Sequence, residues 1–372
     1  MTPTVYVHIP FCETKCPYCD FNSFAVQGRD VDGYLAALSE ELDRRPPPPD
    51  PPTLFIGGGT PTVPRPEQID RYLGDLLRRL RPDPAREFTV EANPGSLTAE
   101  KVAVLAAHGV NRVSLGAQSF LDRHLKTLGR VHSAAQIEEA FRLVRDGGID
   151  NVNLDLIFAV PGLDLRDWLY TLDCAVALQP EHLSCYALIF EPGTEFHARR
   201  QRGLMHALDE EDELRMFRFT ERRLRHAGWQ RYEISAFARP GKHCRHNLGY
   251  WRNEPYAGYG AGAFSYLDGE RCGNERHLER YARAVHERGD AFVSHERLEG
   301  SRAAAETIFL GLRTRYGVRL DSVGERHGID AQREFAPVVT RLREQGLLRR
   351  GEPLRMTRRG WRVADTVSSA FL

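Results

Sequence analysis

The chain is organised around the stretch Cys12-Glu13-Thr14-Lys15-Cys16-Pro17-Tyr18-Cys19, which follows a short run of alternating apolar residues. That run, residues 5–9, predicts a strand that ends at Pro10. Three thiolates at this spacing on one loop can converge on one metal centre. A cubane iron–sulfur cluster normally takes four cysteines, one for each iron, so three leave one iron open to a ligand that is not protein.

A structural zinc site, or three loop cysteines that hold no metal, is the alternative. Structural zinc sites favour paired C-x2-C units and a fourth protein ligand. The chain has no second C-x2-C pair, so the spacing favours an iron–sulfur cluster.

Length and composition set the outer bounds. A chain of 372 residues, 41% of them hydrophobic, predicts one large domain and a smaller one. A formal net charge of zero gives no general electrostatic case for binding nucleic acid or an anionic membrane. Seven cysteines, three of them in one loop, suit a reducing cytosol better than a disulfide framework. No signal-peptide pattern and no run of about 18 apolar residues is present, so we expect a cytoplasmic protein.

Strand-like and helix-like segments alternate over the first half of the chain. The predicted strands are residues 5–9, 53–56, 87–91, 112–116, 152–158 and 183–190. The predicted helices are residues 34–45, 66–80, 98–108, 133–147 and 165–178. Such alternation implies a parallel sheet with right-handed crossovers. Six strand–helix units are too few for a closed eight-stranded barrel, so we predict an α/β fold with an open partial (β/α)6 barrel over residues 1–285.

The pattern changes near residue 299. Helices at residues 303–313, 320–327 and 332–345 precede a predicted hairpin at residues 348–356. Three helices and a wing predict a C-terminal winged-helix-like α domain over residues 299–372. Its arginines raise nucleic-acid binding as a hypothesis. Acidic residues are interspersed among them, which favours a docking domain, so no nucleic-acid partner is expected.

The glycine run Gly57-Gly58-Gly59-Thr60-Pro61 follows the second predicted strand. Glycines let a backbone approach a ligand closely and offer bare N–H groups. A simple tight turn is the alternative. Residues 256–262 are rich in Gly and Tyr, and we interpret them as a close-packed turn near the same ligand site.

The cysteine spacing, with Tyr18 before the last cysteine, resembles the signature of the radical S-adenosylmethionine (SAM) superfamily. That resemblance implies a [4Fe-4S] cluster on Cys12, Cys16 and Cys19, whose open iron is chelated by the amino and carboxylate groups of SAM. It also implies an open partial barrel. The glycine run resembles the family's motif for the SAM amino-acid moiety, here Gly58, Gly59 and Thr60.

Further site residues are implied by the same resemblance. Tyr6 matches a position near the adenine and the cluster, and Glu91 could accept hydrogen bonds from the SAM ribose or amine. Arg130 could pair with the SAM carboxylate in the bidentate geometry that guanidinium favours. The remaining matched positions are Gln118, Asp155, Ala187 and Phe264. For each residue an ordinary strand-end or capping role is the alternative.

Two local features refine the resemblance. The oxygen-independent coproporphyrinogen oxidases carry a further cysteine two residues after the third, where this chain has Phe21. The HemW haem chaperones carry an H-N-x-x-Y-W motif, present here as His246-Asn247-Leu248-Gly249-Tyr250-Trp251. The chain resembles the HemW group over nearly its whole length. This implies a protein that binds haem and passes it to an acceptor protein.

His246 is the predicted haem-iron ligand, because neutral imidazole is a common axial donor and aromatic neighbours can pack the macrocycle. A hydrogen-bonded structural histidine, with Tyr250 and Trp251 in the core, is the alternative. His243 and Cys244 are other ligands that remain open. The other cysteines are most simply buried free thiols, namely Cys174, Cys185 and Cys272.

Two functions from different classes follow from the resemblance. The preferred one is a haem chaperone that holds a [4Fe-4S] cluster, SAM and haem. The alternative is a radical SAM enzyme of the coproporphyrinogen III oxidase type, an activity that the Phe21 position speaks against. Cleavage of SAM, covalent attachment of haem, a membrane-associated haem acceptor and a homodimer are all left open by the sequence.

Overall fold

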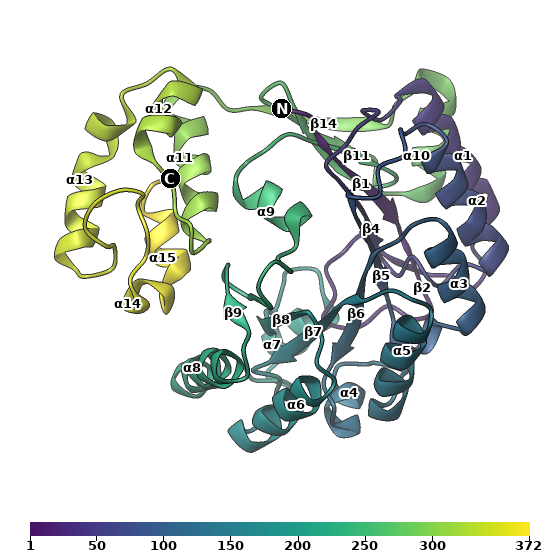
Figure 1. Cartoon of the computed structure of the whole chain (residues 1–372), viewed down its shortest axis with the longest axis horizontal. Coiled ribbons are helices and arrows are strands. Elements are labelled where there is room, and N and C mark those ends of the chain that lie inside the picture. The colour runs from purple at the N-terminus through teal and green to yellow at the C-terminus, as the bar shows by residue number, and fades with distance from the viewer.

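The computed structural model describes all 372 residues and contains one large sheet of twelve strands. Its parallel centre is formed by six strands that follow one another in sequence (Figure 1): β1 (Thr4–Ile9), β4 (Thr53–Gly58), β5 (Glu87–Ala92), β6 (Arg112–Gln118), β7 (Asn151–Phe158) and β8 (His182–Ala187). The outer face of these strands is covered by α1 (Val31–Arg44), α2 (Pro66–Leu77), α3 (Ala99–Ala107), α5 (Ala134–Asp146) and α6 (Leu165–Ala177). The sheet has two free edges, so the predicted open partial barrel is confirmed.

Local sequence explains these elements well, as α5 illustrates. The Ser133 side chain accepts a hydrogen bond from the Gln136 backbone N–H, and Gln136 reaches back to the Ser133 N–H, forming a capping box. The helix buries Ile137, Phe141 and Val144 against the sheet. Burial of each such side chain contributes about 1.5–3 kcal/mol, and loss of the cap costs about 1 kcal/mol.

Strand β11 (Tyr256–Tyr259) corrects the interpretation of residues 256–262 as a turn. It adds a seventh parallel strand beside β1, with Thr4 opposite Tyr256. Only Gly260 and Gly262 turn, at φ of 96° and 80°. The segment pairs with a strand about 250 residues earlier, so no local pattern in the sequence could reveal the pairing.

Antiparallel strands extend both edges of the sheet. Beyond β11 lie β12 (Phe264–Leu267), β13 (Glu270–Asn274) and β14 (Phe292–Arg297), and beyond β8 lie β10 (Ala236–Ala238) and β9 (Gln230–Arg231). The remaining helices of this part are α4 (Asp122–Thr127), α7 (Glu195–Gln201), α8 (Glu210–His226), α9 (Arg245–Trp251) and α10 (Leu278–Arg288). A core of 62 buried residues unites these elements.

The C-terminal helices have a separate core of 16 buried residues. They are α11 (Gly300–Leu312), α12 (Leu320–His327), α13 (Ala331–Glu344), α14 (Arg358–Trp361) and α15 (Ala364–Ser369). The predicted hairpin at residues 348–356 forms only a single bridge between Leu348 and Met356, because Leu354 pairs instead with Val318. Helix α9 contacts both the inner face of β4 and helix α11, and α9 therefore joins the two cores (Figure 1). None of the helices combines the length and apolar character needed to cross a bilayer.

Candidate functional site

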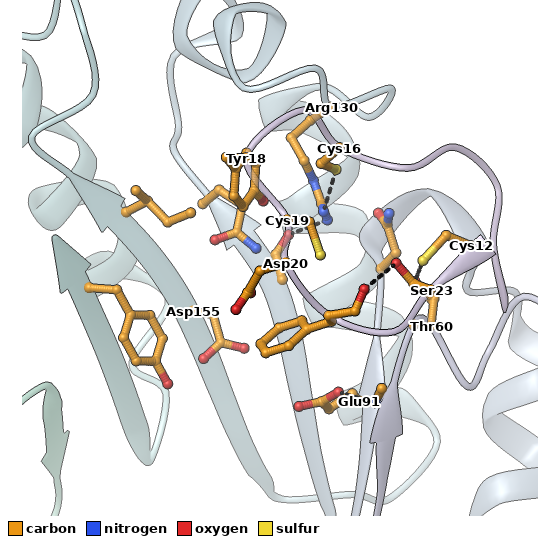
Figure 2. A pocket seen from close by; sticks show the side chains of 18 of the residues that line it. Cys12, Cys16, Tyr18, Cys19, Asp20, Ser23, Thr60, Glu91, Arg130 and Asp155 are labelled. Atoms are coloured by element: carbon orange, nitrogen blue, oxygen red, sulfur yellow. Dashed lines mark hydrogen bonds between the residues drawn. The ribbon is translucent and has the colours of Figure 1, made fainter. Parts of the chain in front are cut away.

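A cavity of about 340 Å³ opens at the carboxyl ends of the parallel strands, beneath the cysteine loop (Figure 2). This is the edge at which α/β folds gather their binding groups. Most of the predicted site residues line it: Cys12, Cys16, Tyr18, Cys19, Gly58, Gly59, Thr60, Glu91, Gln118, Arg130, Asp155 and Ala187. Tyr6, Phe264 and His246 do not.

The cysteine loop is held at both ends by main-chain hydrogen bonds. Strand β2 (Phe11–Cys12) pairs with β3 (Phe24–Ala25), and the Cys19 N–H donates to the Cys16 carbonyl at 3.1 Å. All three thiols are free and half-buried. The loop therefore presents three unpaired sulfurs to one cavity.

The number of sulfurs favours a cluster over a structural zinc site. A structural zinc site takes four protein ligands, almost always cysteine and histidine. Three cysteines line this cavity, and no further cysteine or histidine lines it. A cubane can be held by three cysteines on separate irons, which leaves its fourth iron to another ligand. The donor set thus fits a cluster better than a single metal ion.

Two polar side chains support the sulfurs from the cavity wall. The Thr60 hydroxyl donates to Sγ of Cys12 at 3.7 Å, and the Arg130 guanidinium donates to Sγ of Cys16 at 3.5 Å. Burial raises the pKa of the Cys12 thiol, and burial raises the pKa of Cys19 to about 11, with the neighbouring thiols adding to the shift. Cys12 and Cys19 therefore depend on a bound cation to become thiolates at neutral pH.

The glycine run differs from the prediction in one respect. Its N–H groups are not bare: Gly58 donates to the Glu91 carboxylate at 3.1 Å, Gly59 to the Ile9 carbonyl and Thr60 to the Phe11 carbonyl. Glycine is instead required by close packing. Gly58 has a φ of 112°, and a Cβ there would lie 2.5 Å from the His8 ring. The run brings the end of β4 against β1 and so shapes the cavity floor.

Two carboxylates face the cavity opposite the cysteine loop (Figure 2). Burial, with a further contribution from the nearby Asp155 charge, raises the pKa of Glu91 to about 7. Burial also raises the pKa of Asp155, which accepts hydrogen bonds from Ser114 and Asn153, each at 2.9 Å. These groups can accept hydrogen bonds from hydroxyls or amines, and together they favour a cationic ligand.

Arg130 is the cation of the cavity wall that touches the cysteine loop. It donates to the Gly116 carbonyl at 2.9 Å, while its Nε is buried without a partner. A buried donor without a partner is costly, and an anionic ligand group would satisfy it. Gln118 lies beside it at φ 65°, where an irregularity in β6 breaks the strand register. Such distortions are common beside ligand sites.

Tyr6 and Phe264 line a second cavity of about 550 Å³ on the other side of residues 20 and 21. Asp20 and Phe21 line both cavities. The Tyr6 hydroxyl bonds to Nδ1 of His8 at 2.9 Å, and its ring stacks on Phe55. The structure therefore divides the predicted site residues between two adjacent cavities.

His246 lines neither cavity and is only 1% exposed. Its Nδ1 lies 2.7 Å from the Thr53 hydroxyl and its Nε2 lies 2.9 Å from the Tyr250 hydroxyl, and the ring stacks on Phe55. Burial lowers its pKa to about 3. This is the geometry of a hydrogen-bonded structural histidine, the alternative to a haem ligand. Tyr250, whose hydroxyl shields Nε2, does line the second cavity.

The structure also shows where the other possible haem ligands and the remaining cysteines lie. Cys244 is fully buried with Sγ 3.6 Å from Glu87, and His243 contacts the Tyr316 hydroxyl. Cys185 is buried as predicted. Cys174 and Cys272 are only half-buried, which corrects that prediction, because each lies on an element with one face open to solvent.

Sequence reasoning missed several residues of the first cavity. They are Thr14, Asp20, Phe21, Ser23, Ala92, Asn93, Ser114, Gly116, Ile157, Tyr186, Leu188, Ile189 and Glu191. Tyr186 and Ile189 are large apolar side chains with 43% and 63% exposure just at and beyond the end of β8. Their position at the carboxyl end of a predicted strand could have identified them as site residues, because the carboxyl ends of parallel strands meet at one edge of the sheet.

Comparison with known proteins agrees with this geometry. Residues 6–175 match the family model described as Radical SAM superfamily, and residues 300–363 match that of the HemN C-terminal domain. The solved coproporphyrinogen III oxidase (HemN) of Escherichia coli superposes with a TM-score of 0.87 at 24% identity, covering 100% of this chain and 90% of that one. The match of residues 6–175 to the family model places this part of the chain in the radical SAM superfamily.

Two curated relatives narrow the class. The heme chaperone HemW of Bacillus subtilis is 38% identical over 99% of both chains. The heme chaperone HemW of Escherichia coli is 38% identical over 82% of this chain and 79% of its own. The chain belongs to the HemW family of the radical SAM superfamily.

Proposed function

We propose that this protein is a haem chaperone that carries a [4Fe-4S] cluster on Cys12, Cys16 and Cys19, binds SAM beside it, and passes haem to an acceptor protein. The observation that carries the proposal is the set of three free, half-buried cysteines facing one cavity with no fourth protein thiol among them. The relatives named heme chaperone supply the haem part of the proposal.

The first cavity offers complementary groups for each end of SAM. Arg130, with its unpaired Nε, binds the carboxylate, while Glu91 and Asp155 accept hydrogen bonds from the ribose hydroxyls or the amine. Gly58, Gly59 and Thr60 hold the amino-acid moiety against the loop, and Gln118 and Ala187 complete the wall. When bound, the cluster would supply an open iron that the amino and carboxylate groups of SAM could chelate.

Haem ligation by His246 stays a prediction. In the described conformation both ring nitrogens are engaged, so ligation requires that the Tyr250 hydroxyl leave Nε2. The neutral imidazole that burial enforces is the form that binds iron.

We also propose that residues 1–285 form the cofactor-binding domain and residues 299–372 a docking domain for the haem acceptor. The separate core of 16 buried residues supports a unit with its own packing.

Anaerobic reconstitution of the full chain, followed by iron, sulfide and haem quantification with absorption and EPR spectra, tests the proposal. We expect about four irons and four sulfides per chain, with binding of SAM perturbing the EPR signal of the reduced cluster. Cys16→Ser should lose the cluster, whereas Cys174→Ser, outside both cavities, should keep it. Zinc in place of iron and sulfide would contradict the proposal.

The oxidase alternative is tested in the same preparation. Incubation with coproporphyrinogen, SAM and a reductant should yield no protoporphyrinogen. Phe21 stands where a further cysteine would be needed for the oxidase pattern, and its ring, 63% exposed, lines both cavities. Formation of protoporphyrinogen would favour the oxidase.

A further inference from the structure

The second cavity contains two of the predicted ligand-site residues, Tyr6 and Phe264, but none of the three loop cysteines. It lies between the sheet and the C-terminal helices, since its lining includes Tyr6 of β1, Phe264 of β12 and Leu310 of α11. Its volume of about 550 Å³ is within the range of about 300–1,000 Å³ that is common for small-molecule sites. It opens beside the first cavity, with which it shares Asp20 and Phe21.

Five tyrosine and phenylalanine side chains line this cavity, namely Tyr6, Phe21, Tyr250, Tyr256 and Phe264. Tyr250 meets Tyr256 edge-on at a centroid distance of 4.8 Å, and Phe264 is 50% exposed at the opening. Large exposed rings around a cavity mark a binding surface for an apolar ligand, because they gain free energy when water is displaced. Flat aromatic faces particularly suit a flat ligand.

One cation at the cavity is free. Arg271 is committed to Glu296 at 3.0 Å and Glu306 at 2.9 Å, whereas the Arg276 guanidinium is exposed and makes no ion pair or side-chain hydrogen bond. Its backbone carbonyl is fixed by a hydrogen bond from Asn22 at 3.0 Å, which anchors the residue at the cavity. A free guanidinium beside aromatic walls fits a ligand with apolar faces and a carboxylate edge.

We propose that haem occupies this second cavity, with its macrocycle against Tyr250, Tyr256 and Phe264 and a propionate paired with Arg276. The placement rests on the proposed haem-chaperone function and adds the site. It also gives the H-N-x-x-Y-W motif a physical role, since Tyr250 forms part of the wall and separates the cavity from His246, whose Nε2 lies 2.9 Å from the Tyr250 hydroxyl. Leu310 closes the cavity from the C-terminal helices, so haem contacts both parts of the chain.

The test is a haem titration of the full chain, reconstituted anaerobically with its cluster and followed by the Soret band. Arg276→Glu should weaken haem affinity about tenfold or more, because a charge-assisted pair is replaced by repulsion. Arg280→Glu is the matched control, since Arg280 lies outside the cavity and pairs with Glu275. Leu310→Trp should fill the cavity and weaken haem at least as much, whereas Leu204→Trp, at a 72% exposed site elsewhere, should not.

A second ligand isolates the carboxylate contact. Ferric mesoporphyrin dimethyl ester lacks free carboxylates, so Arg276→Glu should leave its affinity unchanged, whereas Leu310→Trp should weaken it like haem. Cluster content and SAM affinity, which report on the first cavity, should stay at the wild-type level in both variants.

The outcomes separate this placement from the proposed function. Wild-type protein that binds haem while Arg276→Glu and Leu310→Trp match their controls would overturn the placement alone. Competition between SAM and haem would also overturn it, because it would put SAM on Tyr6 and Phe264 in the same space. Wild-type protein that takes up cluster and SAM but no haem would overturn both.

Discussion

The guanidinium of Arg130 lies 3.5 Å from Sγ of Cys16, so one side chain joins the cysteine loop to the strands that carry the first cavity. The two residues are separated by 114 positions in sequence. The guanidinium donates a hydrogen bond to this sulfur and so holds the Cys16 side chain at the wall of the first cavity. Nε of Arg130 is buried without a hydrogen-bond partner, and we propose that Arg130 both positions a cluster cysteine and binds the SAM carboxylate.

Replacement of Arg130 tests this double role. Arg130→Gln should lower SAM affinity about tenfold or more, since a charge-assisted hydrogen bond is worth about 1.5–3 kcal/mol. Arg130→Lys should recover part of it through charge alone. Equilibrium SAM binding to the reconstituted protein is the measurement. Arg123→Gln, which removes an exposed arginine paired with Asp167, is the control, and equal affinities in both would refute the role.

Glu91 predicts a pH effect on stability. Its pKa of about 7 in the folded chain lies above the value of 4.5 for a free glutamate, so the folded state binds more protons than the unfolded state between those values. The Glu91 contribution to stability is therefore greatest at low pH and falls as pH rises from about 4.5 to about 7.

The variant Glu91→Gln removes this titration. Relative to wild type without ligands, it should gain stability as pH rises through that window, by on the order of 2 kcal/mol in total. Urea denaturation at several pH values between 4 and 8 measures the difference. A difference between the two proteins that does not change with pH would show that Glu91 titrates normally.

Gly58 is expected to tolerate no side chain. Gly58→Ala must keep a φ of 112° and places its Cβ 2.5 Å from the buried His8 ring, so we expect a loss of more than about 1 kcal/mol of stability. Gly148→Ala is a matched control, because Gly148 also has positive φ but a Cβ there meets nothing within 4 Å. Thermal unfolding compares the two, and equal losses would mean that backbone strain alone sets the cost.

His246 should matter for stability before any haem is added. His246→Ala leaves the Thr53 and Tyr250 hydroxyls without their partner and opens a cavity beside Phe55. We expect a loss of about 2–4 kcal/mol by chemical denaturation of the haem-free protein.

Iron ligation by His246 makes a separate prediction. If His246 ligates the iron, His246→Ala at saturating haem should change the ferric absorption spectrum, and added imidazole should restore the wild-type spectrum. A wild-type spectrum in the variant, together with the lost stability, would leave His246 with the structural role alone. Tyr250→Phe serves as the control, because it removes the hydroxyl that shields Nε2 and keeps the ring at the cavity.

The local sequence was enough to predict the six parallel strands, their helices and the capping box at Ser133, because periodicity, caps and breakers act over short distances. It also predicted three cysteines on one loop, since their spacing is a local property. In an open parallel sheet the carboxyl ends of the strands lie along one edge, so these local features also place the cysteine loop beside the other strand ends.

Only the tertiary structure decided which cavity each residue faces. Tyr6 and Cys12 are six positions apart yet line different cavities, and His246 is enclosed between Thr53 and Tyr250. The strand β11 beside β1 likewise came from a distant segment. Side-chain direction in a sheet depends on register with neighbouring strands, and register is fixed by long-range pairing and packing that no single stretch of sequence contains.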